Sequence, residues 1–197
     1  MLNSYSNMIY GFMENEIDSL KDVRDNLSEQ IDPVIEVLLH NKGKLIFMGV
    51  GKSGLIGRKL AATFSSTGTP SFFVHATESV HGDLGMIERN DVVILISNSG
   101  ETKEILAPLK SLNIIGVTTI AFTGNESSSL AKACDYKVII HVDNEADKLN
   151  LAPTNSSTAV LVVGDAIACT LSETKQFTRD DFAIFHPGGA LGKKLIS

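Results

Sequence analysis

The segment Ser97-Asn98-Ser99-Gly100-Glu101-Thr102 gathers three hydroxyl groups around a glycine. It follows an apolar, β-branched run at 92–96 that is typical of a buried parallel strand, and it precedes a stretch with helical spacing. At such a junction the first N–H groups of the helix lack intrahelical partners and carry the positive end of the macrodipole. Together with the hydroxyls they predict an anion site sized for one phosphate. The alternative is a simple helix cap, but a cap needs only one hydroxyl.

Glutamates that follow the predicted strands are candidates for proton transfer. Glu101 and Glu104 begin the helix behind this loop, where such residues ordinarily complement the helix dipole. A bound phosphate nearby raises a carboxyl pKa, which suits a general base or proton carrier near neutral pH. Glu145 has the equivalent place after a later strand, where a solvated acidic loop is the alternative. We therefore expect Glu104 or Glu145 to shuttle protons.

A second glycine-rich turn, Gly49-Val50-Gly51-Lys52-Ser53-Gly54, lies between a strand-like and a helix-like run. It does not fit a P-loop, because Ile46 stands where the first glycine is required. Its glycines fit a dinucleotide fingerprint, but the acidic residue expected after the next strand is missing, since that strand ends in His75. The turn instead offers the Lys52 ammonium and the Ser53 hydroxyl to a phosphate or sugar oxygen at a helix N-terminus.

Two of the five histidines are acid/base candidates. His81 and His186 each precede a glycine-bearing turn, and an unperturbed imidazole titrates near cellular pH. His40 ends a helical pattern and His141 lies in a strand-like run, so we interpret both as structural. No pair has the spacing of a zinc site, and no nucleophile elbow occurs, so we expect neither a metal nor a serine hydrolase.

Composition predicts one globular domain in the cytoplasm. The chain has 197 residues, 43% hydrophobic, and a net charge of −6, which argues against nucleic acid or an anionic membrane as the main partner. Cys134 and Cys169 lie far apart in apolar segments, as expected of reduced core residues. The N-terminus shows no signal-peptide pattern, and no apolar segment reaches membrane-spanning length.

Short apolar strands alternate with helical segments along the chain. The expected strands are 44–48, 72–74, 92–96, 117–122 and 136–142. This alternation predicts an α/β fold, a three-layer sandwich with a mainly parallel five-stranded sheet flanked by helices. Ligands bind beyond the carboxyl ends of such strands, where the polar motifs lie. We expect residues 1–30 to be a helical segment that packs on the domain or on a neighbouring subunit, and residues 31–197 to form the domain.

Several separated motifs resemble the SIS (sugar isomerase) domain, a phosphosugar-binding α/β fold, and more narrowly the D-arabinose 5-phosphate isomerases. The SIS motifs are 49–54, 97–102 and the hydroxyl cluster 154–158. The narrower ones are His81-Gly82-Asp83-Leu84-Gly85-Met86, Leu151-Ala152-Pro153-Thr154, Gly164-Asp165-Ala166 and His186-Pro187-Gly188-Gly189-Ala190-Leu191-Gly192. The resemblance runs from about residue 31 to residue 195. Many members carry a pair of CBS domains afterwards, whereas this sequence stops at Ser197, so we expect the short form without them.

The resemblance implies an enzyme that interconverts D-ribulose 5-phosphate and D-arabinose 5-phosphate without a cofactor, the first step toward the Kdo sugar of lipopolysaccharide or capsule. It implies phosphate binding by Gly51, Ser53, Ser97, Asn98, Ser99 and Thr102. It places Lys52, Glu104, Glu145 and His186 in the active site, with His81 as a further acid/base candidate. It also implies a homotetramer whose sites are completed by neighbouring subunits.

The chemistry needs few groups. A proton leaves the carbon beside a carbonyl, a cis-enediol forms, and a proton returns to the neighbouring carbon. We expect His186 or His81 to be the carbon acid/base, Glu104 or Glu145 its partner, and Lys52 the cation that stabilises the enediolate. The alternatives are a SIS isomerase of another sugar phosphate, or a non-catalytic phosphosugar sensor. Sensors usually carry a DNA-binding helix-turn-helix, for which the residues before Ile31 are too few and too acidic.

Overall fold

A parallel sheet of five strands forms the centre of the structure, a computed structural model that describes residues 4–27 and 30–188. The strands are β1 (Leu45–Gly49), β2 (Ser71–His75), β3 (Val92–Ile96), β4 (Thr118–Thr123) and β5 (Tyr136–Ile139). Their order is β2-β1-β3-β4-β5, and each neighbouring pair is parallel. Every residue of β1 and β3 is buried, which explains why both read as unbroken apolar runs. The predicted fold class is confirmed.

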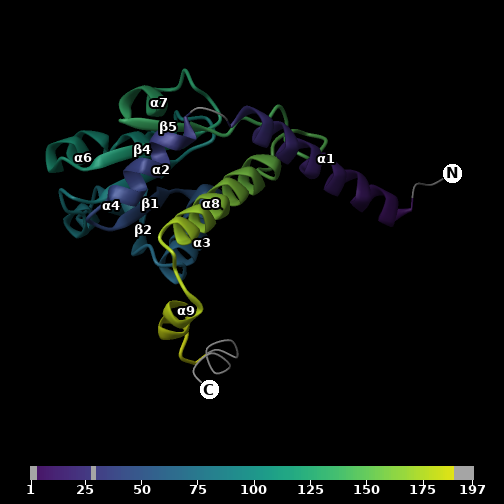
Figure 1. The fold of residues 1–197 in the computed structure, drawn as a ribbon. Coiled ribbons are helices and arrows are strands. Elements are labelled where there is room, and N and C mark those ends of the chain that lie inside the picture. Colours follow the sequence, from purple (N-terminus) through teal and green to yellow (C-terminus); the bar gives the residue numbers. More distant parts are fainter. Residues whose placement is uncertain (1–3, 28–29, 189–197) are drawn as a thin grey trace.

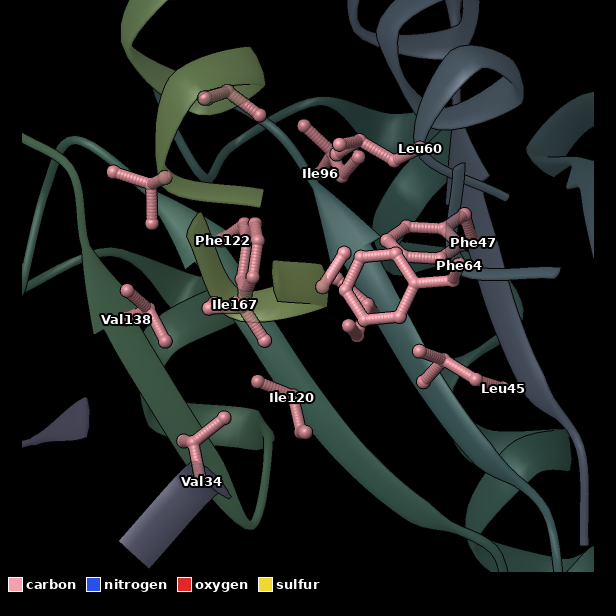
Figure 2. Close-up of a cluster of buried hydrophobic side chains, with 14 of the residues drawn as sticks. Val34, Leu45, Phe47, Leu60, Phe64, Ile96, Ile120, Phe122, Val138 and Ile167 are labelled. Carbon is pink, nitrogen blue, oxygen red and sulfur yellow. The ribbon is translucent and has the colours of Figure 1, made fainter. Parts of the chain in front are cut away.

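Helices cover both faces of the sheet (Figure 1). One layer consists of α2 (Ile31–His40), α3 (Gly51–Ser66) and α8 (Asn155–Thr174), with the end of α1 (Tyr5–Asn26). The other layer consists of α4 (Ala76–Ser79), α5 (Lys103–Leu106), α6 (Leu109–Ile115) and α7 (Ser129–Ala133). Figure 2 shows the first core, in which Phe47 and Phe122 of the sheet meet Phe64 of α3 and Ile167 of α8.

The helix α1 projects from the body of the molecule toward the N-terminus, and it crosses the start of α8 (Figure 1). Two hydrogen bonds join the helices: Asn155 Nδ2 donates to Asn15 Oδ1 at 2.8 Å, and Thr158 Oγ1 donates to Glu16 Oε2 at 2.8 Å. Large apolar side chains of α1 are exposed, namely Tyr5, Met8, Ile9, Tyr10, Phe12, Met13 and Ile17. That residues 1–30 pack on the domain or on a neighbouring subunit therefore stays a prediction.

Element boundaries differ from the sequence pattern at places that matter for the site. The helix α3 begins at Gly51, so Lys52 and Ser53 lie in its first turn. The helical stretch after β3 is divided into α5 and α6 at Pro108, whose ring removes a backbone donor. The strand β5 ends at Ile139, so His141 lies outside it. The helix α8 begins at residue 155, earlier than the apolar run that starts at 159.

Candidate functional site

A cavity of about 400 Å³ opens at the carboxyl ends of the strands. It is lined by Lys52 and Ser53 from the first turn of α3, Asn98 after β3, Glu145 after β5 and Ser156 from the first turn of α8. The strand β2 lies on one side of β1 and β3 lies on the other, so the direction of the chain connections reverses between β1 and β3. The cavity therefore occupies a topological switch point of the sheet. Ligands of open parallel sheets bind at such points, and the volume suits a small molecule.

Glu145 caps the start of α8. Its Oε2 accepts hydrogen bonds from Thr154 N at 2.8 Å, Thr154 Oγ1 at 3.2 Å and Ser156 N at 3.1 Å. Its Oε1 accepts from Ser156 Oγ. Burial alone would raise the pKa of Glu145, but the hydrogen bonds from Ser156 and Thr154 outweigh it and hold the pKa below its ordinary value. The cavity therefore contains an ionised carboxylate, and Oε1 keeps room for one more donor.

The loop that carries Glu145 is held by its own side chains. Asp147 accepts hydrogen bonds from three backbone N–H groups, those of Leu149, Leu151 and Ala152. Asn150 has a left-handed backbone with φ 54°, and its Oδ1 accepts from Glu145 N at 2.6 Å. Asn150 also lines the cavity, and the sequence interpretation missed it. The available signal was its residue type, since asparagine adopts this conformation more readily than other non-glycine residues.

Hydroxyl groups of the predicted phosphate loop, residues 97–102, make contacts within the loop itself. Ser97 is 3% exposed, and its Oγ lies 2.9 Å from Thr102 Oγ1 while accepting from Gly100 N at 3.1 Å. Ser99 Oγ accepts from Glu101 N at 3.2 Å. Of this loop, Asn98 lines the cavity described above. Within the described residues, the N–H groups of Ser99 and Thr102 have no protein acceptor, so both are available to an anion.

The two first-turn glutamates of this region lie apart from the cavity. Glu101 Oε1 accepts from Ser129 N at 2.7 Å, and this backbone hydrogen bond lowers the pKa of Glu101. Glu101 therefore ties the loop to α7. Glu104 is exposed in α5 and does not line the cavity. Its predicted role in proton transfer stays a prediction.

The two candidate histidines lie away from Glu145. His81 is exposed in the turn between α4 and the short helix η1 (Asp83–Met86). His186 follows α9 (Arg179–Phe185), and its ring stacks on Phe182 with the centroids 3.8 Å apart. The helix α8, which is about 30 Å long, separates Glu145 at its start from α9 beyond its end (Figure 1). A single chain therefore does not bring His186 to the cavity.

A second, more open cavity of about 660 Å³ lies on the other side of the start of α3. Its lining includes Gly51, Lys52, Arg58, Phe73 and His75. The Arg58 guanidinium lies 5.1 Å from the centre of the Phe73 ring. His75 Nδ1 is buried and has no hydrogen-bond partner in the part of the chain that the structure describes. Because Lys52 lines both cavities, it is the residue that connects them.

Two features are absent from residues 4–27 and 30–188. No helix there has the length and apolar character needed to cross a membrane. No group of three or more His, Cys, Asp or Glu side chains there could hold a metal ion.

These features define an α/β domain with a small, polar ligand cavity at the switch point of its sheet. Residues 38–169 match the SIS domain family, and the chain belongs to that family. The family resemblance inferred from the sequence motifs is thereby confirmed.

The chain is similar to curated arabinose 5-phosphate isomerases named KdsD. It is 50% identical to that of Francisella tularensis over 184 residues, which cover 92% of this chain and 56% of the relative. It is 51% identical to that of Escherichia coli K12 over 181 residues, which cover 92% of this chain and 55% of the relative. The chain thus spans about half the length of these curated relatives.

Solved structures share the whole fold. A protein of Escherichia coli CFT073 in complex with arabinose 5-phosphate is 59% identical, with a TM-score of 0.92 over 95% of this chain and 100% of that chain. A putative sugar-phosphate isomerase of Listeria monocytogenes is 29% identical, with a TM-score of 0.91 over 95% of this chain and 99% of that one.

Proposed function

We propose that the chain is an aldose-ketose isomerase that interconverts D-ribulose 5-phosphate and D-arabinose 5-phosphate. The observation that supports this most strongly is the likeness to the arabinose 5-phosphate complex, which extends over the whole of that chain at 59% identity. The names of the curated relatives at about 50% identity agree with it. The cavity of about 400 Å³ is of the size that small-molecule sites have.

The cavity supplies groups that the reaction needs. The Lys52 ammonium stabilises negative charge on the enediolate oxygen as the carbon proton passes to the acid/base histidine, His186 or His81, which returns it to the neighbouring carbon. Glu145 is an ionised carboxylate whose Oε1 accepts a further hydrogen bond, so it receives a proton from a sugar oxygen during the transfer between the two oxygens. The N–H groups and side chains of the 97–102 loop hold the phosphate, with Ser53 from the first turn of α3. Neither step requires a redox cofactor or a metal.

His186 reaches the cavity from a second copy of the chain in this proposal. Within one chain, α8 separates His186 from Glu145, yet both belong to the catalytic set that the family resemblance implies, together with His81 and Glu104. The exposed apolar side chains of α1 provide a surface for association, which we assign to a homotetramer. Mixing Lys52→Ala and His186→Ala subunits tests this. Recovery of activity, from two inactive parents, is expected for shared sites, whereas no recovery in confirmed mixed oligomers contradicts them.

We further propose, from the family resemblance, that the enzyme acts at the first step of Kdo synthesis for lipopolysaccharide or capsule and, from the cysteine usage and N-terminal sequence, that it acts in the cytoplasm.

The substrate is tested directly with purified protein. D-ribulose 5-phosphate is offered beside a hexulose 6-phosphate and a heptulose 7-phosphate, and each aldose product is quantified. The proposal expects turnover of the pentose phosphate with the highest kcat/KM. A higher kcat/KM for a longer sugar would assign a different SIS isomerase, and binding of all three without turnover would assign a sensor.

A further inference from the structure

Only one end of the Asn150 amide has a structural role in the loop, where its Oδ1 accepts from Glu145 N. The backbone of Asn150 is left-handed with φ 54°, a conformation that costs a residue with a Cβ more than it costs glycine. Asn150 lies in the loop between β5 and α8 and lines the cavity of about 400 Å³. Glycine would satisfy the backbone at lower cost, so the amide group is what asparagine adds at this position.

One end of that amide has a partner and the other has none among the described residues. Asn150 Oδ1 accepts from Glu145 N at 2.6 Å, and this contact fixes the orientation of the amide because an N–H group requires an acceptor. The Nδ2 group donates to no acceptor in residues 4–27 and 30–188. Asn150 thus presents donors beside a cavity that Glu145 also lines.

We propose that Asn150 is a specificity-determining residue that contacts a hydroxyl group of the sugar. Its Nδ2 donates to the hydroxyl oxygen, and the hydroxyl proton is donated in turn to Glu145 Oε1, which has acceptor capacity left. A donor beside an acceptor matches a hydroxyl, which does both, and does not match a phosphate dianion, which only accepts. The pair therefore recognises the polyol part of the ligand. The inference rests on the proposed function, because it requires a sugar phosphate in this cavity.

Two variants separate contact with the sugar from support of the loop. Asn150→Gly keeps the left-handed backbone without strain and removes the whole amide. Asn150→Asp keeps the size of the side chain and an oxygen for Glu145 N, but it replaces the donor with a carboxylate. The affinity of each protein for D-arabinose 5-phosphate and for inorganic phosphate is measured by calorimetry, with the melting temperature as a check on folding.

Loss of one neutral hydrogen bond corresponds to about a three- to tenfold change in affinity. Both variants are therefore expected to bind D-arabinose 5-phosphate at least about threefold more weakly while binding inorganic phosphate as the wild type does. Asn150→Asp is expected to melt near the wild type. If it retained wild-type affinity for the sugar phosphate, Asn150 would only support the loop, and the inference would be overturned. An equal loss of affinity for inorganic phosphate would overturn it as well.

Wild-type turnover, measured in parallel, distinguishes this inference from the proposed function. Wild-type protein that binds D-arabinose 5-phosphate without isomerising it would contradict the proposed function, while the affinity ratios would still decide the role of Asn150. Wild-type turnover with unchanged sugar-phosphate affinity in both variants would leave the function in place and overturn the role of Asn150. Wild-type protein that did not bind the sugar phosphate would overturn both.

Discussion

Glu145 carries two roles, as the cap of α8 and as an ionised group in the cavity, and substitution separates them. In Glu145→Gln the remaining carbonyl oxygen takes the position of Oε2, which accepts from Thr154 and from Ser156 N. The new amide nitrogen then faces Ser156 Oγ, which turns from donor to acceptor. The change loses the charge assistance and the favourable interaction with the helix dipole, about 1 kcal/mol of unfolding free energy.

Glu145→Ala removes every acceptor at once and leaves the donors of Thr154 and Ser156 dependent on water. We expect a loss of about 2–4 kcal/mol. Urea unfolding followed by circular dichroism measures both variants, and the order wild type, Gln, Ala is the expected ranking. Turnover separates the second role: Glu145→Gln is expected to lose at least about 100-fold in kcat despite its small loss of stability. An Ala variant as stable as the wild type would refute the capping argument.

The pH dependence of stability has a sign that follows from the same hydrogen bonds. Because they lower the pKa of Glu145 in the folded state, the unfolded state takes up the proton first as the pH falls. The stabilisation is fully present above the unfolded pKa, about 4.5, and is lost as the pH falls through the lower folded pKa. Glu145→Gln should therefore show a shallower loss of stability below about pH 5 than the wild type. Equal slopes in urea titrations at pH 3–5 would contradict this.

Three further predictions concern packing and thiol chemistry. A Cβ on Gly49 would lie 2.9 Å from the carbonyl of Ser53, so Gly49→Ala should cost about 1–3 kcal/mol of stability and weaken ligand binding; wild-type stability would contradict that close approach. The matched control is Gly11→Ala, where a Cβ meets nothing within 4 Å, and thermal melting should show a gain of about 0.5–1 kcal/mol. Burial raises the pKa of Cys134 to about 12, whereas Cys169 is exposed. After brief alkylation of the folded protein, mass spectrometry should therefore find the label on Cys169. Label on Cys134 in the folded protein would contradict the structure.

The sheet was accessible from the sequence because burial on both faces leaves a direct trace in composition. The strands β1 and β3 are buried at every residue and read as unbroken apolar runs. The position of the polar motifs then followed, since parallel strands bring their carboxyl ends to one edge. Lys52, Ser53 and Glu145, which belong to those motifs, line one cavity with Asn98, for which only the family resemblance implied a binding role.

The positions of site residues relative to one another depend on where the helices begin and how long they are, and the sequence pattern does not show either. The helix α8 starts four residues before its apolar run, and that earlier start places the N–H groups that Glu145 caps. Its length separates His186 from Glu145, which no local pattern records. The Ser97 hydroxyl accepts from Gly100 N and lies 2.9 Å from Thr102 Oγ1, contacts within the loop that no local pattern records, and its role in binding an anion stays a prediction.

The most direct measurement of the central claim is isomerisation in deuterated water, followed by NMR with EDTA present. Purified protein is given D-ribulose 5-phosphate, and the D-arabinose 5-phosphate formed is examined at C2. The account predicts product that carries deuterium at C2, because the proton removed on the way to the enediol exchanges with solvent at the base. Absence of product, with the sugar phosphate bound, would contradict the claim that this cavity isomerises pentose phosphates.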